Sequence, residues 1–260
     1  MSKKQTIADA PDHMIIRIGE GGSPEEAERL SARLRIPLEQ DAPDVNQERG
    51  LILFLDHGGL ALQYHGQMLR GDFTGMKKRL QTGNLQREML VRAVKIKNME
   101  VPYVIDATAG MGEDSMILAA AGCRVRMYER DPVIAALLDD ALRRASRIPE
   151  LSGPVGRMQL FEKDSVEALR SLAEPPDVIL LDPMFPERQK SALVKKKFQL
   201  LHHLERPCED EESLLQAAIL ARPRKIVIKR PLKGSLLAGR KPDYSLKGKA
   251  IRYDVLVFAR

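Results

Sequence analysis

The sequence predicts an α/β protein: a domain built on a parallel sheet with helices on both faces, preceded by a small α+β domain. From Pro102 onward, short apolar runs alternate with stretches of helical periodicity, which is typical of a parallel sheet covered on both sides. Before residue 70, a helix start and two apolar runs around His57-Gly58-Gly59 instead indicate a βαββ-like unit. These two patterns together define the predicted fold class.

The small domain is expected within residues 1–75. Residues 14–18 have the pattern of a strand, and Ser23-Pro24-Glu25-Glu26 has the composition of a helix start, with serine as the N-cap. That helix is expected to end near Leu34, and strands at 51–56 and 60–64 are expected to form a hairpin. A basic amphipathic helix near 83–97 should then form the link, across residues 76–100, to the second domain.

The second domain is expected to span residues 101–260, with strands and helices in alternation. The expected strands are 103–106, 124–128, 158–161, 178–181, 225–229 and 251–259. The expected helices are 113–121, 131–145 and 165–172, with further helical stretches up to about residue 221. A loop rich in glycine and lysine is expected before the last strand.

Composition limits the class of protein. The 260-residue chain is 43% hydrophobic, so it can bury a core, and it has no apolar run of the length that a membrane helix needs. The N-terminal residues lack the apolar stretch of a secretory signal, and Cys123 and Cys208 are too few and too isolated for a disulfide framework or a zinc site. We therefore expect a cytoplasmic protein without a metal. The net charge of +6, partly in clusters such as Lys195-Lys196-Lys197, fits the footprint of a phosphate backbone.

The residues that end the strands are the most informative ones, because ligands bind beyond the carboxyl ends of the strands in an open parallel sheet. The first strand ends in Asp106 and a turn with Gly110 and Gly112, which permit a tight turn and a close approach to a ligand. The turn is not a full dinucleotide fingerprint, because Ser115 stands where a third glycine would be. Glu129 ends the second strand and could bind both hydroxyls of a ribose.

Further residues near the strand ends indicate which cofactor fits. Arg130 could lie against an adenine, and Asp164 with Ser165, after the third strand, could hold the adenine amine. Glu113 and Asp114 occupy a helix N-terminus that would otherwise attract pyrophosphate, so they would repel the phosphates of NAD or FAD. They would attract the ammonium and sulfonium groups of S-adenosylmethionine. The sequence also lacks the Gly-Lys-Ser/Thr motif of an NTPase.

The fourth strand ends in Asp182-Pro183-Met184-Phe185-Pro186, the candidate catalytic motif. The Asp182 carboxylate can accept hydrogen bonds from an amine, and Pro183 donates none, which leaves its carbonyl as a second acceptor. Phe185 offers an apolar face on which a base can stack. Two acceptors and a stacking face suit the exocyclic amine of a nucleobase.

Several functions are compatible with these residues to different degrees. The amine could belong to a guanine or to an adenine, so an adenine-N6 methyltransferase of the same fold stays open beside a guanine-N2 enzyme. An NAD-dependent oxidoreductase is disfavoured by the acidic turn and by the missing third glycine. A non-catalytic RNA-binding protein is disfavoured by the intact acids at the strand ends.

Long motifs resemble the bacterial ribosomal RNA small subunit methyltransferase J family. They lie at 106–112, 123–125, 129–130, 133–140, 182–196 and 229–231, and the resemblance covers most of residues 85–260. It implies a Rossmann-like methyltransferase fold whose last strand is antiparallel, with S-adenosylmethionine as the donor. It also implies methylation of N2 of a guanine near the 3′ end of 16S rRNA, in free RNA or in the small ribosomal subunit.

The resemblance also implies which residues form each part of the site. The donor site falls on Glu113, Asp114, Glu129, Arg130, Asp164, Ser165 and Asp182. Independently of the resemblance, the charge of the basic residues beside the catalytic motif and at the end of the fifth strand suggests that they contact the phosphates of the RNA. These residues are Lys190, Lys195, Lys196, Lys197, Lys229 and Arg230.

Overall fold

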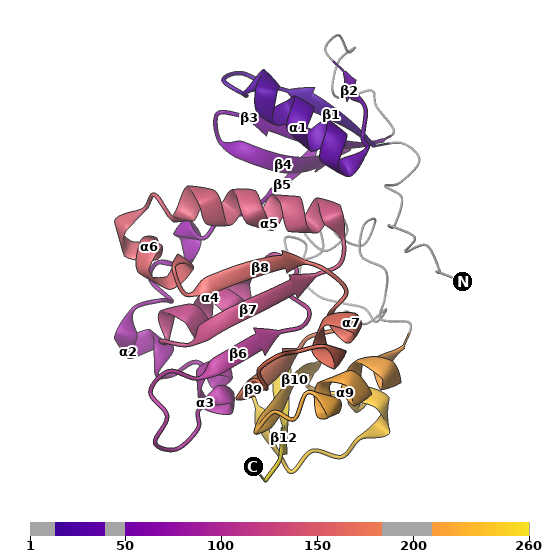
Figure 1. The fold of residues 1–260 in the computed structure, drawn as a ribbon. Coiled ribbons are helices and arrows are strands. Elements are labelled where there is room, and N and C mark those ends of the chain that lie inside the picture. Colours follow the sequence, from indigo (N-terminus) through magenta and orange to yellow (C-terminus); the bar gives the residue numbers. More distant parts are fainter. Residues whose placement is uncertain (1–13, 40–49, 184–209, 260) are drawn as a thin grey trace, which may run out of the picture. The chain divides into compact units, whose positions relative to one another are not determined.

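A computed structural model describes residues 14–39, 50–183 and 210–259 and divides the chain into two units (Figure 1). The first unit contains the described residues up to Gly71 together with the segment Asp131–Ala141. The second contains residues 72–130, 142–183 and 210–259. The segment Asp131–Ala141, which the sequence assigned to the second domain, therefore groups with the first unit.

The first unit is a five-stranded sheet in the order β2-β1-β3-β4-β5. Its elements are β1 (Met14–Ile18), α1 (Pro24–Leu34), β2 (Leu38–Glu39), β3 (Leu51–Asp56), β4 (Gly59–Tyr64) and β5 (Gln67–Arg70). β1 is parallel to β2 and β3, whereas β4 is antiparallel to both β3 and β5. The Ser23 side chain accepts a hydrogen bond from the Glu26 amide (3.3 Å), so the predicted N-cap of α1 is confirmed. The short strands β2 and β5 were not predicted.

The segment after the first unit differs from the prediction of one helix at 83–97. It contains three short helices, η1 (Thr74–Met76), α2 (Thr82–Leu85) and α3 (Met89–Val94). Glu88 has an extended backbone (φ −63°, ψ 124°) and separates α2 from α3. Gly83 lies inside α2, where glycine is a poor helix former. The prediction of a single helix was therefore wrong.

The second unit contains a seven-stranded sheet in the order β11-β12-β10-β9-β6-β7-β8. From residue 103 the chain runs through β6 (Tyr103–Asp106), α4 (Glu113–Ala120), β7 (Arg124–Glu129), α5 (Pro132–Ala145), α6 (Pro149–Val155), β8 (Met158–Glu162), α7 (Ser165–Arg170), β9 (Val178–Leu181), α9 (Glu211–Leu220), β10 (Lys225–Pro231), η2 (Leu237–Gly239), β11 (Tyr244–Lys247) and β12 (Ile251–Val257). Of these elements, α5 up to Ala141 groups with the first unit. β6 to β10 pair in parallel, and β12 is antiparallel to β10. The antiparallel last strand is confirmed, whereas α6 and β11 were not predicted.

The centre of this sheet determines where a ligand can bind. β9 is fully buried between β6 and β10, and its four residues are 0% exposed. From β6 the chain adds β7 and β8 on one side, and from β9 it adds β10 and β12 on the other. The order of strands thus reverses between β6 and β9, and open α/β sheets bind ligands at the carboxyl ends of the strands at such a point.

No helix in the described ranges has both the length and the apolar character that crossing a membrane requires.

Candidate active site

The turn after β6 is shaped by the buried carboxylate of Asp106, which is 2% exposed. One carboxylate oxygen accepts a hydrogen bond from the Thr108 amide (3.1 Å), and the other accepts one from the Ser115 hydroxyl (2.7 Å). Gly110 and Gly112 have φ values of 52° and 74°, in the left-handed region that glycine adopts readily. Asp106 therefore fixes the turn between β6 and α4.

Glu129, at the end of β7, lies directly beside this turn. Asp106 is paired with Met127 in the β6–β7 register, so Glu129 extends beyond the end of β6. Its carboxylate accepts a hydrogen bond from the Gly110 amide at 2.9 Å, across a sequence separation of 19 residues. The glycine turn and the predicted ribose-binding acid are thus brought into contact.

Asp164 and Ser165 lie at the start of α7, on the same edge of the sheet as Glu129. One Asp164 oxygen, Oδ1, accepts hydrogen bonds from the amides of Val166 (2.8 Å) and Glu167 (3.2 Å), so Asp164 is the N-cap of α7. Arg130 is exposed directly after β7, and Glu113 is exposed at the first position of α4.

A lysine from β10 joins acids from two other loops. Lys229 Nζ lies 2.6 Å from Asp114 Oδ2 and 2.9 Å from Asp182 Oδ2. The register explains this placement, because Ile228 is paired with Leu181 and the next residue of each strand is Lys229 or Asp182. The Asp182 amide also donates a hydrogen bond to Thr108 Oγ1 (2.7 Å), which ties the candidate catalytic motif to the turn after β6.

The charges of this cluster influence one another. Burial opposes the charge on Lys229, but the attraction of Asp182 and Asp114 outweighs it and raises the pKa of the lysine. Removal from water also raises the pKa of Asp182, although 39% of its side chain is exposed, and the charge of Lys229 acts in the opposite direction. Lys229 therefore contributes most to the ionised form of Asp182, and the charge of Arg230 acts in the same direction.

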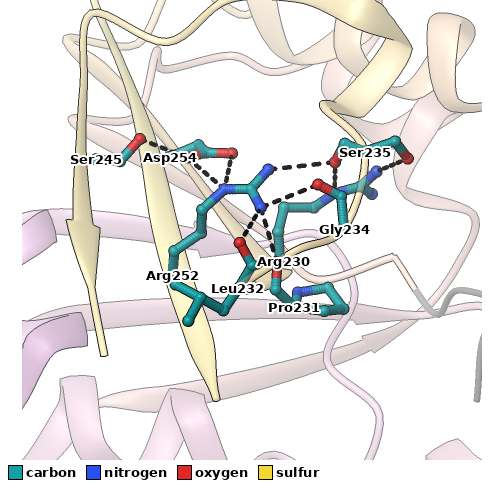
Figure 2. A network of polar contacts seen from close by, with 8 residues as sticks. All are labelled: Arg230, Pro231, Leu232, Gly234, Ser235, Ser245, Arg252 and Asp254. Carbon is teal, nitrogen blue, oxygen red and sulfur yellow. Dashed lines mark hydrogen bonds and ion pairs between the residues drawn. The ribbon is translucent and has the colours of Figure 1, made fainter. Parts of the chain in front are cut away.

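Two residues predicted to contact RNA have other partners. Arg230 is 1% exposed, and its guanidinium donates hydrogen bonds to the Ser235 carbonyl (2.8 Å) and hydroxyl (3.1 Å) and to Glu211 (3.4 Å) (Figure 2). The prediction of RNA contact for Arg230 was wrong, because an enclosed guanidinium cannot reach a phosphate backbone. Lys229 lies among the acids of the site, with its side chain 24% exposed.

The described residues include only part of the catalytic motif and of the predicted RNA contacts. Pro183 is buried directly after Asp182. Phe185, Lys190, Lys195, Lys196 and Lys197 lie outside the described residues.

Sequence reasoning missed three residues of the cluster or its surroundings. These are Thr108, the partner of the Asp182 amide; Lys229 in its role between acids; and Tyr253 of β12, which is 2% exposed. Burial raises the pKa of Tyr253, and the neighbouring Asp114 acts in the same direction. A signal existed for Lys229, because it follows an apolar run in a strand whose end lies on the same edge as Asp182.

The residues at the carboxyl ends of β6 and β7 fit S-adenosylmethionine. Glu129 lies beside a left-handed glycine turn, and α4 begins with two acids, which suit a cationic ligand better than a pyrophosphate. With the reversal of strand order at β6 and β9, these features define an S-adenosylmethionine-dependent methyltransferase. In agreement, residues 36–258 match the family described as "Putative SAM-dependent methyltransferase".

The chain belongs to the ribosomal RNA small subunit methyltransferase J family. It is 43% identical over 241 residues to the protein of that name from Thioalkalivibrio sulfidiphilus, with 90% of this chain and 93% of that protein covered. It is 40% identical over 245 residues to the one from Pseudomonas fluorescens, with 92% of each covered. A crystal structure of an S-adenosylmethionine-dependent methyltransferase from Neisseria gonorrhoeae superposes with a TM-score of 0.72 at 30% identity, covering 93% of this chain and 95% of that one. The resemblance seen in the motifs is thereby confirmed.

The buried Asp106 predicts a pH dependence of stability. Burial raises the pKa of Asp106 from 3.8 to about 7, against the opposing hydrogen bonds from Ser115 and Thr108. The folded protein therefore holds this proton more tightly than the unfolded chain, so this carboxyl lowers stability as the pH rises from about 4 to about 7.

Asp106→Asn should remove this loss, because the amide keeps an oxygen for Thr108 and does not ionise. Between pH 4 and pH 8, the free energy of unfolding should fall less in the variant than in the wild type, by up to roughly 4 kcal/mol. Urea unfolding at both pH values measures the difference. Equal losses in the two proteins would contradict the prediction.

Proposed function

We propose that this enzyme transfers a methyl group from S-adenosylmethionine to N2 of a guanine in 16S rRNA, free or assembled in the small ribosomal subunit, in the cytoplasm. The observation that carries the proposal is the placement of Asp182 at the reversal of strand order. There it is bonded to Lys229 and Thr108, beside the acidic glycine turn. The relatives named ribosomal RNA small subunit methyltransferase J support an rRNA substrate.

The donor is proposed to lie along the turn after β6. Gly110 and Gly112 permit a close approach of the backbone, and Glu129 would accept hydrogen bonds from the ribose hydroxyls. Asp164 and Ser165 would hold the adenine amine, and Arg130 would lie against the ring. S-adenosylmethionine supplies an electrophilic methyl group, because that group is attached to a positively charged sulfur. Asp106 is proposed to shape the turn from within the protein, because both of its oxygens already bond there.

The acceptor is proposed to be held by the catalytic motif. The lone pair of guanine N2 is delocalised into the ring, so this amine is a poor nucleophile. Hydrogen bonds from its two N–H groups to the Asp182 carboxylate and the Pro183 carbonyl would favour a more pyramidal nitrogen with an available lone pair. Stacking on Phe185 would contribute about 1–3 kcal/mol to holding the base. Much of the rate would then come from positioning, and the proton can leave after the transfer.

A guanine in a helix must leave its base stack before it can reach Asp182, which costs a few kcal/mol. The loss of pairing and stacking must be offset by contacts with the flanking nucleotides.

Mass mapping of 16S rRNA from cells with and without the protein tests the function. We expect one guanine to lose a methyl group in the absence of the protein and to regain it when purified enzyme and S-adenosylmethionine are added. If an adenine loses the methyl group, the adenine-N6 alternative is correct. If no nucleotide does, the proposed substrate is wrong.

The proposed ribose contact can be tested separately. Glu129→Gln should weaken binding of S-adenosylmethionine by roughly tenfold or more, because hydrogen bonds to a charged group contribute about 1.5–3 kcal/mol. Titration calorimetry measures the Kd. Glu174→Gln is a matched control, because Glu174 pairs with Arg124 at the amino end of β7, away from the site. An unchanged Kd in Glu129→Gln would remove Glu129 from the donor site.

A further inference from the structure

A buried arginine holds the loop that follows β10 (Figure 2). Arg252 of β12 is 7% exposed, and its guanidinium donates hydrogen bonds to four backbone carbonyls within residues 231–235. These are the carbonyls of Pro231 (2.8 Å), Leu232 (3.0 Å), Gly234 (3.0 Å) and Ser235 (3.3 Å). One side chain thus fixes the backbone of residues 231–235.

Arg230 bonds to the same loop, and acids compensate both charges. The Arg230 guanidinium donates to the carbonyl and the hydroxyl of Ser235, and it pairs with Glu211. Arg252 pairs with Asp254 at 2.9 Å. Burying two guanidinium groups is costly unless each is paired and hydrogen-bonded, and here most of these bonds end on one loop. The backbone of this loop, which contains Gly234, is therefore hydrogen-bonded at four of its five residues.

This loop lies at the edge of the sheet that carries the active site. It begins where β10 ends, two residues after Lys229, which contacts Asp182. The Leu232 amide donates to the Ala250 carbonyl (2.9 Å), so the loop is bonded to the turn between β11 and β12. The Gly248 amide closes that turn on the Ile251 carbonyl (2.9 Å).

Three exposed lysines lie on these two connected segments. Lys233 is on the loop, and Lys247 and Lys249 are on or beside the turn. We call these three residues the basic rim. Residues 231–235 and 247–250 contain no acid, so the positive charge of the rim is not offset within either segment.

We propose that the basic rim binds the phosphates of RNA next to the guanine that enters the active site; this inference rests on the proposed function. A phosphate backbone is recognised mainly by lysine and arginine, and such contacts set the register of the nucleic acid without reading its sequence. A rim on a rigid support loses little conformational entropy on binding. Arg230 and Arg252 thus serve RNA binding from inside the protein, by holding the loop that presents Lys233.

Charge reversal of the rim tests this assignment. Lys233→Glu/Lys249→Glu should raise the Kd for 16S rRNA by about tenfold or more, and should reduce the slope of log Kd against log salt by about 2, one for each lost phosphate contact. Filter binding over a series of salt concentrations measures both quantities. The Kd for S-adenosylmethionine and the unfolding temperature should not change, because neither lysine contacts the donor site.

The control is Lys95→Glu/Lys97→Glu, which changes the net charge of +6 by the same amount. Both lysines are exposed, and the Lys95 carbonyl accepts a bond from Lys225 at the start of β10, so they lie near the opposite edge of the sheet. The control should bind RNA as the wild type does. If the rim variant binds 16S rRNA and the assembled small subunit as tightly as the control does, with the same salt dependence, the rim does not bind RNA phosphates.

The same proteins distinguish this inference from the proposed function. If the wild type methylates its guanine and the rim variant binds RNA normally, only the rim is wrong. If the wild type transfers no methyl group to guanine, the proposed function fails, whatever the rim does.

Discussion

Replacing Asp182 by alanine is expected to lower kcat for methyl transfer by at least on the order of 10²–10³-fold, the loss seen when one preorganised hydrogen-bonding group is removed from an active site. The carboxylate lies at the end of β9, bonded through its backbone to Thr108 and through its side chain to Lys229. Without it, the target amine keeps only the Pro183 carbonyl as an acceptor in the proposed arrangement. Methyl transfer to 16S rRNA under single-turnover conditions measures the loss directly.

Binding should be affected much less than catalysis. Most of the proposed donor contacts come from the turn after β6 and from Glu129, so the Kd for S-adenosylmethionine should rise only slightly in Asp182→Ala. A matched pair of variants, Asp182→Asn and Asp177→Asn, makes the same chemical change at the two ends of β9. Asp177 accepts a hydrogen bond from the Tyr103 amide (3.0 Å) at the amino end, so Asp177→Asn should keep its activity. Full activity in Asp182→Ala would exclude the assigned role.

The strand-end acids could be predicted because sequence and structure share a simple geometry there. A parallel strand appears as an apolar run, and the residue after it must lie on the edge where ligands bind. Asp106, Glu129 and Asp182 were found in this way, and the register then placed Glu129 against Gly110 and Asp182 against Thr108. This part of the site depends on local sequence and on topology, and both can be predicted from the sequence.

The partners of the basic residues could not be predicted in this way. Lys229 and Arg230 formed part of a basic cluster in the sequence, and a cluster of that kind usually faces solvent. In the structure, Lys229 bonds to Asp114, which is 115 residues away, and Arg230 bonds to Ser235 and Glu211. The sequence does not distinguish an exposed charged residue from one that is paired, so ion pairs between residues far apart in the chain cannot be predicted from it.

The unpredicted elements are short or carry conflicting signals. α6 contains Pro154, a residue that disfavours a helix interior, and β2 has only two residues. β11 is a half-exposed strand next to β12, in a segment whose glycine and lysine content indicated a loop. Residues 244–247 form a strand because they pair with β12, and local composition does not reveal that pairing.

Replacing Lys229 by methionine is expected to shift the pH dependence of methyl transfer to higher pH. The variant would leave Asp114 and Asp182 close together without the cation between them, and like charges raise the pKa of one acid. Removal from water already raises the pKa of Asp182, and Lys229 opposes that rise. Because the proposed role of Asp182 needs its ionised form, a higher pKa reduces the active fraction at low pH. The acidic limb of the kcat profile should therefore move to higher pH.

Two further variants separate this effect from a loss of structure. Lys229→Arg keeps the positive charge, so its acidic limb should stay near that of the wild type even if its rate falls. Lys225→Met removes a lysine from the other end of β10, where Nζ donates to the carbonyls of Ala93 (3.3 Å) and Lys95 (2.7 Å). That change should lower stability without moving the acidic limb. If Lys229→Met is slower but has the acidic limb of the wild type, Lys229 only supports the structure, and the ionisation of Asp182 does not depend on it. If the acidic limb shifts in Lys229→Met but in neither Lys229→Arg nor Lys225→Met, the charge of Lys229 keeps the Asp182 carboxylate ionised. The register of β9 and β10, which places the two side chains together, then determines the charge of the catalytic residue.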